Sequence, residues 1–259
     1  MAQPTVKKVT KKDAIPEYYL LNSQVGIPTS DGKIQVNKDK EALHAYFLQY
    51  VNPNTVFFTT LEEKIQYLLR EDYLDEQVFD KYSMKQIKAL YKRAHSFKYR
   101  FNSFTSAHKF YKQYALRTRE GDRFLGRFED VMVWVSMSFA NGDFQLAEQY
   151  VDLMMSRAFT PATPTLLNIG RKTGGELTSC YLLAFQDNLP SIRRVKADGE
   201  ALSALGGGVS FNLINVRETL APIRKRKGLA SGVVPIAKIL EDIGTYANQG
   251  GKEVCHRTV

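Results

Sequence analysis

The sequence predicts a mainly α-helical N-terminal region followed by the start of a parallel α/β layer. Two observations support this fold class. Apolar residues recur at helical spacing through the first 160 residues, and after Pro161 short apolar runs alternate with helical segments. The order strand, helix, strand, helix favours a parallel sheet over an antiparallel one.

The composition is that of an ordinary globular protein. The chain has 259 residues, of which 44% are hydrophobic and 24% charged, and no apolar run approaches the length of a membrane span. Its two cysteines do not form a disulfide framework. These features predict a cytoplasmic protein with reduced thiols and no membrane partner.

The net charge of +9 indicates an anionic partner. The dense basic clusters are KKVTKK near the N-terminus and RKRK at 224–227. Neither cluster is interleaved with aromatic residues or accompanied by a known nucleic-acid-binding motif. We therefore expect small anionic ligands such as nucleotides, and no nucleic acid.

The first part of the chain is expected to be an extended lead-in over residues 1–37, disordered over 1–16, followed by helices. Apolar residues share one face of DKEALHAYFLQYV, and Thr60 can cap LEEKIQYLL. Ser83 and Gln86 form a capping box ahead of the next helix.

A second helical block begins near residue 103. FEDVMVWVSMSFA is apolar nearly all round and is therefore expected to be buried, and Asp143 can cap the helix after it. The histidines in these blocks (His44, His95 and His108) have no second ligand at metal spacing, so we predict no metal site.

The amino-acid composition changes at Pro161. PATPTLLNIGRKTGGE is rich in Pro, Thr and Gly and is expected to be a loop. LTSCYLLAF and VSFNLIN are predicted strands, separated by the helix PSIRRVKADGEALSAL and the glycines Gly206–Gly208. A further helix is predicted over VVPIAKILEDIGTYA.

Cys180 lies in what is expected to be a buried strand, close to glycines that suit phosphate binding. A thiol there either fills the core or takes part in redox chemistry. Three glycines in a row are also explained by a tight turn, and the segment has neither a P-loop nor a dinucleotide fingerprint. The residues alone leave both interpretations open.

Four motifs carry a resemblance to a known family. PATPTLLNIGR, ELTSCYLLAFQDNLPSI, LSALGGGVSFNLINVR and YANQGG occur in an order that resembles the N-terminal third of the large, catalytic subunit of ribonucleotide reductase, class Ib. The resemblance covers about residues 17–252 and implies a ten-stranded α/β barrel. It implies a class Ib N-terminal domain over 17–98, a second helical domain over 99–176, and the first strands and helices of the barrel with an effector site over 177–259.

The resemblance implies a role in catalysis for residues around the first strand. Cys180 resembles the first member of the redox pair that reduces the 2′ carbon of a ribonucleotide, and its disulfide partner would lie on a later strand. Thr163, Ser179 and the backbone of Gly207 and Gly208 resemble substrate-binding positions. No covalently bound cofactor and no metal is implied on this chain, because the radical comes from a dimetal small subunit.

The resemblance also implies an effector site for nucleoside triphosphates (ATP, dATP, dTTP, dGTP). Asp187 resembles the acid that holds the effector ribose, and Arg217, Arg224 and Lys225 resemble cations near its phosphates. An alternative reading of Asp187 is a cap for the helix that starts near Pro190. The implied partners are the small subunit, a second copy of the chain through barrel helices, the nucleotide substrate, and thioredoxin or a glutaredoxin-like reductant.

The match ends after YANQGGK, where the chain continues as EVCHRTV. Cys255 and His256 have no counterpart and receive no role. The radical-generating cysteine and the partner of Cys180 lie further along in family members, so we expect an inactive N-terminal fragment. The alternative is a non-catalytic nucleotide-binding or dimerisation module. Apolar side chains on the barrel helices are expected to be incompletely covered: Leu202, Leu205, Ile236, Ile239, Leu240 and Ile243.

Overall fold

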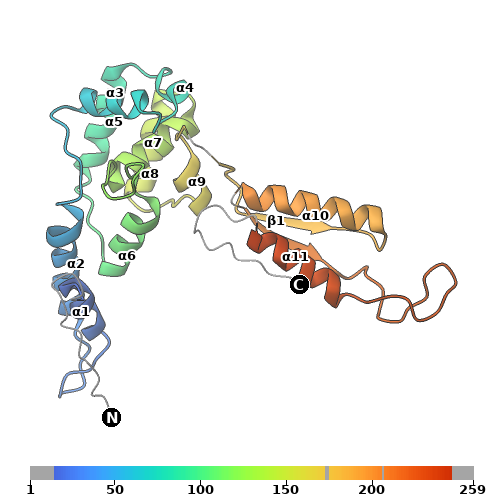
Figure 1. The fold of residues 1–259 in the computed structure, drawn as a ribbon. Coiled ribbons are helices and arrows are strands. Elements are labelled where there is room, and N and C mark those ends of the chain that lie inside the picture. Colours follow the sequence, from blue (N-terminus) through green and yellow to red (C-terminus); the bar gives the residue numbers. More distant parts are fainter. Residues whose placement is uncertain (1–14, 173–174, 206, 247–259) are drawn as a thin grey trace, which may run out of the picture. The chain divides into compact units, whose positions relative to one another are not determined.

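The computed structural model describes residues 15–172, 175–205 and 207–246 (Figure 1). The chain divides into two compact units. We call them the helical unit (Met1–Arg70 and Gln77–Phe159) and the sheet unit (Glu71–Glu76 and Thr160–Val259). A mainly helical region is followed by a parallel α/β layer, which confirms the predicted fold class.

The first part of the chain, up to residue 159, is built from α-helices and two short π-helical turns. In chain order these are α1 (Glu17–Gln24), α2 (Val36–Tyr46), η1 (Phe47–Val51), α3 (Leu61–Arg70), α4 (Glu76–Phe79), α5 (Met84–Ser96), α6 (Phe104–Lys109), η2 (Phe110–Tyr114), α7 (Phe128–Ala140) and α8 (Phe144–Met155).

The predicted helix starts are confirmed by capping hydrogen bonds. The Glu63 N–H donates to Thr60 Oγ1 at 3.1 Å, and the Leu146 N–H donates to Asp143 Oδ1 at 3.0 Å. Ser83 and Gln86 form the expected capping box. Each cap satisfies an N–H group that has no partner within its own helix.

The prediction of an extended lead-in is wrong for residues 17–24, which form α1. Residues 1–14 lie outside the described part of the chain, so the expected disorder there is not addressed. Pro16 has φ −56°, a value that suits the residue ahead of a helix. Tyr18 is buried and packs its ring against Tyr46 and Phe104, with centroids 5.2 and 5.9 Å apart. This tertiary packing forms a helix that the local pattern does not reveal.

The core of the helical unit surrounds α7, as its all-round apolar sequence predicts. Trp134 is 1% exposed, and its indole Nε1 donates to the Tyr91 hydroxyl at 2.7 Å. The Tyr82 hydroxyl donates to the Met137 carbonyl at 2.9 Å. Both polar groups that accompany these rings are therefore satisfied inside the core.

The sheet unit contains α9 (Thr163–Asn168), β1 (Cys180–Ala184), α10 (Leu189–Ala204), β2 (Gly208–Asn212) and α11 (Val234–Tyr246). The strands pair in parallel, with Cys180 opposite Gly208 and Ala184 opposite Asn212. The prediction of a loop over residues 161–176 is wrong at α9. Pro164 stands in the first turn, where a proline is tolerated because its missing N–H has no helical partner to lose.

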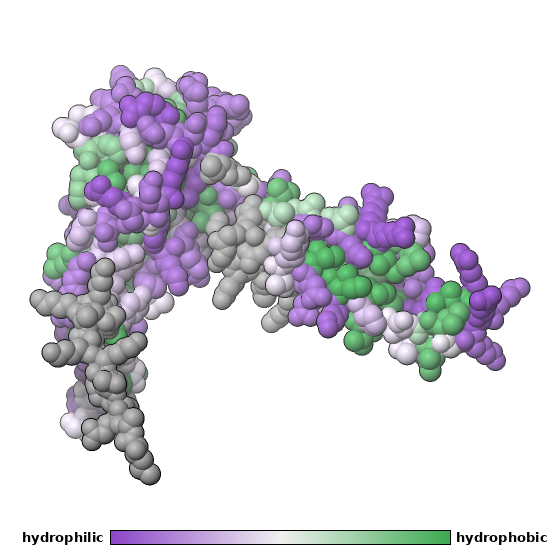
Figure 2. Space-filling model, in the orientation of Figure 1, coloured by the Kyte–Doolittle hydropathy of each residue, from purple (hydrophilic) through white to green (hydrophobic). Residues whose placement is uncertain are grey.

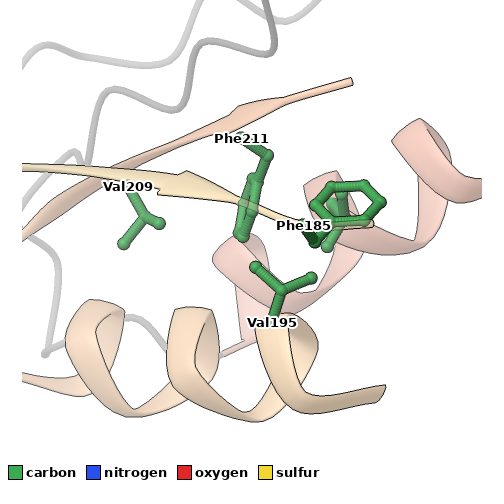
Figure 3. Close-up of a cluster of buried hydrophobic side chains, with 5 residues drawn as sticks. Phe185, Val195, Val209 and Phe211 are labelled. Atoms are coloured by element: carbon green, nitrogen blue, oxygen red, sulfur yellow. The ribbon is translucent and has the colours of Figure 1, made fainter. Parts of the chain in front are cut away.

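One face of this sheet is covered. Val195 of α10 packs against Val209 and Phe211 of β2 and against Phe185, which follows β1, and Leu240 of α11 completes the cluster (Figure 3). A methyl group on Gly199 would lie 2.6 Å from the Phe211 ring, so α10 can approach the sheet this closely only with glycine there.

Apolar side chains also remain exposed on this unit, and Figure 2 shows a continuous apolar area on the face turned to the viewer. Leu205 and Ile239 are each 43% exposed, as expected for incompletely covered helices. Leu240 was expected to share this exposure and does not, because it enters the core cluster at 1% exposure. No helix in the described ranges is long and apolar enough to cross a membrane.

Candidate functional site

The sheet has a second face that carries the thiol. Successive residues of a strand point to opposite faces, so Cys180, Leu182 and Ala184 lie opposite the core cluster, together with their register partners on β2. Cys180 is exposed, and Leu182 is 84% exposed. The prediction that this strand is buried is therefore wrong for β1, because the helices of the described chain cover only the other face of the sheet.

Strand pairing brings four of the five predicted substrate-binding residues together. Gly208 is in register with Cys180, and its N–H donates to the Ser179 carbonyl at 2.8 Å. Gly207 is buried, and any side chain there would overlap the Tyr181 ring. The glycine turn therefore keeps the backbone of β2 close to the strand that bears the thiol.

Thr163, the fifth residue, is held by a different element. It is the first residue of α9 and is exposed. It belongs to the sheet unit, as do Ser179 and Cys180.

Asp187 and Arg217 form an ion pair in the sheet unit. Arg217 donates from Nε and from its backbone N–H to Asp187 Oδ2, the latter at 3.3 Å, and from Nη2 to the Asp187 carbonyl at 3.1 Å. Both residues are partly buried. Charge-assisted hydrogen bonds of this kind fix the position of both side chains.

The alternative role of Asp187 as a helix cap is wrong. The neighbouring residue, Asn188, caps α10, because its Oδ1 accepts from the Ser191 N–H at 2.9 Å. The Asp187 carboxylate is therefore not used as a cap, and it pairs with Arg217 instead.

A cavity of about 930 Å³ opens beside this pair. Asp187, Arg217 and Arg224 line it, so the structure brings three of the four predicted effector residues together. Two further cations, Arg193 and Lys196 of α10, also line it and were not identified from the sequence. Their spacing of three residues on a predicted helix places them on one face, and that signal could have found them.

The segment after Arg217 forms a tight hairpin at the fourth predicted residue, Lys225. Ile223 and Arg226 exchange two backbone hydrogen bonds of 2.9 Å, and the residues between them, Arg224 and Lys225, have φ of 49° and 65°. Two consecutive positive φ values are typical of a type I′ turn, which normally takes Asn or Gly. Strain of this kind is commonly found at functional sites.

The thiol and the cavity lie at opposite ends of β1. Cys180 begins the strand, Asp187 follows its end, and five strand residues span about 13 Å at the usual rise. The arrangement therefore offers two separate sites. One presents a thiol beside backbone glycines, and the other presents cations and a carboxylate around a cavity large enough for a nucleotide. Within the described ranges, no cluster of three metal-ligating side chains occurs.

Family models match three consecutive parts of the chain. They are ribonucleotide reductase N-terminal over residues 18–99, ribonucleotide reductase, all-alpha domain, over 100–174, and ribonucleotide reductase, barrel domain, over 178–254. The chain belongs to the ribonucleotide reductase family.

Curated relatives agree with this assignment. The chain is 44% identical over 241 residues to ribonucleoside-diphosphate reductase subunit alpha of Bacillus subtilis. The aligned region covers 93% of this chain and 34% of that protein. It is 40% identical over 214 residues to the subunit alpha of Mycoplasma pneumoniae, with 83% and 30% covered. The chain thus spans about a third of the length of these ribonucleotide reductase relatives.

Proposed function

We propose that this chain provides the first part of the large, catalytic subunit of a class Ib ribonucleoside-diphosphate reductase, an enzyme that makes deoxyribonucleotides for DNA synthesis by radical chemistry. One observation carries the proposal. In a chain of this family, a thiol and a cation-lined cavity stand at the two ends of one strand, where a reductase needs a redox group and a separate effector site.

In this proposal Cys180 is the redox thiol. It gives a hydrogen to the substrate radical and ends in a disulfide with a second cysteine, while the 2′ hydroxyl leaves as water. Its exposure on the uncovered sheet face supports this role, because a reacting thiol must reach its substrate. Thr163, Ser179, Gly207 and Gly208 would bind the substrate, the glycines through backbone N–H groups near its diphosphate. Cys255 lies outside the described residues.

The cavity would hold a nucleoside triphosphate effector such as ATP, dATP, dTTP or dGTP. Asp187 would accept hydrogen bonds from the ribose, and Arg217, Arg224 and Lys225 would meet the phosphates. Because Arg217 closes over Asp187 in this structure, effector binding requires this pair to exchange partners. We expect that cost to weaken the affinity.

The proposed partners follow from the same assignment. A dimetal small subunit would supply the radical, and thioredoxin or a glutaredoxin-like protein would reduce the disulfide in the cytoplasm. A second copy of the chain would pack against α10 and α11. Exposed apolar residues on these two helices support such a contact, for example Leu189 at 68% and Val234 at 73% exposure.

A second candidate is a non-catalytic nucleotide-binding or dimerisation module. One observation favours it, since three of the proposed effector residues line one cavity in this part of the chain. Assaying ribonucleoside diphosphate reduction with the radical subunit and a thiol reductant added separates the two candidates. Nucleotide binding without reduction, in a subunit of the relatives' full length, would favour the module.

Calorimetry with dTTP on the 259-residue chain tests the proposed effector site. We expect weak binding that weakens further with salt, because phosphate meets cations in an open loop. Asp187→Ala should lower the affinity about tenfold, which is the size of one charge-assisted contact. Asp198→Ala is the matched control, since that exposed carboxylate lies outside the cavity lining. Equal affinities for the two variants would reject the site.

A further inference from the structure

The turn between α7 and α8 carries the only asparagine of the sequence that is followed by glycine, Asn141–Gly142. The proposed function gives this turn no role. Asn141 is exposed and ends α7 in the left-handed conformation, with φ 49° and ψ 39°, and Gly142 has φ 102°. Asparagine and glycine adopt such angles more readily than other residues, which explains their presence in a tight turn between helices.

An asparagine before glycine can lose ammonia without an enzyme. The Gly142 nitrogen attacks Cγ of the Asn141 side chain, and a new C–N bond closes a five-membered imide. The side-chain nitrogen leaves as ammonia and takes the former Gly142 proton with it. Water then adds to either carbonyl of the imide and opens the ring to aspartate or to isoaspartate. Glycine permits the attack because it has no side chain in the path of the nitrogen.

Hydrogen bonds hold this turn in a form that does not react. The Asn141 N–H donates to the Met137 carbonyl at 3.0 Å, which keeps Asn141 at the end of α7. The Asn141 Oδ1 accepts from Lys81 Nζ, which fixes the side-chain amide. Closing the imide ring requires the Asn141 backbone to rotate out of the left-handed conformation, so these bonds have to open before the reaction.

The attacking nitrogen is itself held by Tyr82. The Gly142 N–H donates to the Tyr82 hydroxyl at 2.9 Å, and that hydroxyl donates its own proton to the Met137 carbonyl, also at 2.9 Å. Tyr82 is 5% exposed, so breaking these bonds leaves polar groups poorly solvated. Burial raises the pKa of Tyr82, so the hydroxyl keeps its proton and does not act as a base on Gly142.

We propose that Asn141 is a deamidation site of this chain, and that Tyr82 limits its rate by holding the Gly142 N–H until the end of α7 opens locally. The product carboxylate stands at the C-terminal end of α7, where a negative charge is unfavourable and where Lys81 partly compensates it. Isoaspartate also lengthens the backbone of the turn by one carbon. The reaction therefore loosens the connection between α7 and α8 as the protein ages, whatever the sheet unit binds.

Peptide mass spectrometry of the full chain, incubated at neutral pH and then digested, tests this proposal. We expect conversion of amide to acid to accumulate first at Asn141, with isoaspartate among the products. Tyr82→Phe should accelerate it about five- to tenfold, the rate equivalent of one hydrogen bond. Tyr91→Phe is the matched control, because it removes a hydroxyl from a similarly buried tyrosine whose partner is Trp134, and it should leave the rate unchanged.

Urea provides a second measurement that needs no variant. Local opening exposes little surface, so the deamidation rate of the unsubstituted chain should stay nearly constant in urea below the unfolding transition. A rate that climbs steeply with urea, or that rises equally in Tyr82→Phe and Tyr91→Phe, would show that only the unfolded chain reacts. Slower conversion at Asn141 than at Asn102, an exposed asparagine followed by serine, would overturn the assignment of the site.

Discussion

The helical unit and the sheet unit bury their apolar residues in different ways. Nine of the thirteen residues of α7 are buried, so this helix is covered on every side by its own unit. No residue of β1 is buried, and Leu182 in its centre is 84% exposed. A mainly apolar sequence predicts burial in both cases, yet only the helix is covered by other residues of the described chain.

This difference separates residues that stabilise from residues that are available for chemistry. In the helical unit, the Trp134 indole N–H donates a hydrogen bond to the Tyr91 hydroxyl inside the core. In the sheet unit, the thiol of Cys180 and much of the cation-lined cavity face outward, over a core that covers only one side of the sheet. The proposed chemistry therefore lies where packing is least complete.

The strongest test of this comparison uses the same substitution in both units. Leu90 of α5 is fully buried, so Leu90→Ala should lower the free energy of unfolding by about 2–5 kcal/mol. Leu182→Ala removes an exposed side chain and should change it by less than about 0.5 kcal/mol. Urea unfolding followed by the fluorescence of Trp134, the only tryptophan, measures the stability of the helical unit. Hydrogen exchange measures the stability of the sheet unit. A large loss in Leu182→Ala would mean that the face of Cys180 is covered in solution.

A somewhat smaller effect is expected where α10 meets the sheet. Gly199→Ala places a methyl group against the Phe211 ring and should cost about 1–3 kcal/mol through overpacking. Gly26→Ala is the control, because nothing lies within 4 Å of the added carbon. Hydrogen exchange of β2 should accelerate only in Gly199→Ala. Unchanged protection there would show that the single covered face does not hold this unit together.

The hairpin at Arg224 and Lys225 should respond in opposite ways in stability and binding. Lys225→Gly relieves a positive φ and should stabilise the sheet unit by about 1 kcal/mol. The same change removes a proposed phosphate contact and should weaken dTTP binding. Lys227→Gly removes an equal charge at a residue without positive φ and should not stabilise. If neither stability nor dTTP affinity differs between the two variants, the turn is not a strained binding element.

The smallest effect concerns pH. Burial, with a contribution from Lys112, lowers the pKa of His108 below its ordinary value of 6.5. The unfolded chain therefore takes up this proton more readily than the folded chain. The contribution to stability is complete above about pH 6.5 and is lost as the pH falls through the lowered pKa of the folded state. Urea midpoints from Trp134 fluorescence should fall between pH 7.5 and 5, and His108→Gln should reduce this fall.

Sequence reasoning succeeded where local chemistry decides the structure. The caps at Thr60, Ser83 and Asp143 and the parallel order of strands and helices follow from side-chain type and apolar period. Sequence reasoning failed where tertiary contacts or a single proline decide the structure. α1 is held by aromatic packing of Tyr18, and α9 begins at a Pro-Thr segment that also suits a loop.

The candidate sites show the same division. Motif order identified the strand of Cys180 and the pair Asp187 and Arg217, whose contact the structure contains. Burial of β1 could not be predicted from its apolar run, because burial depends on what covers the second face. Arg193 and Lys196 lie on a predicted helix, but their place in the cavity depends on how that helix packs in the fold.

Cys180 is the most direct test of the account. The measurement is reduction of a ribonucleoside diphosphate by residues 1–246 joined to the remaining part of the Bacillus subtilis alpha relative, with a radical subunit and a thiol reductant supplied. We predict turnover with Cys180 and no thiol-supported turnover with Cys180→Ser, while substrate binding stays nearly unchanged, because a hydroxyl keeps the shape but cannot form a disulfide. Full turnover in Cys180→Ser would contradict the account and return this thiol to a structural role.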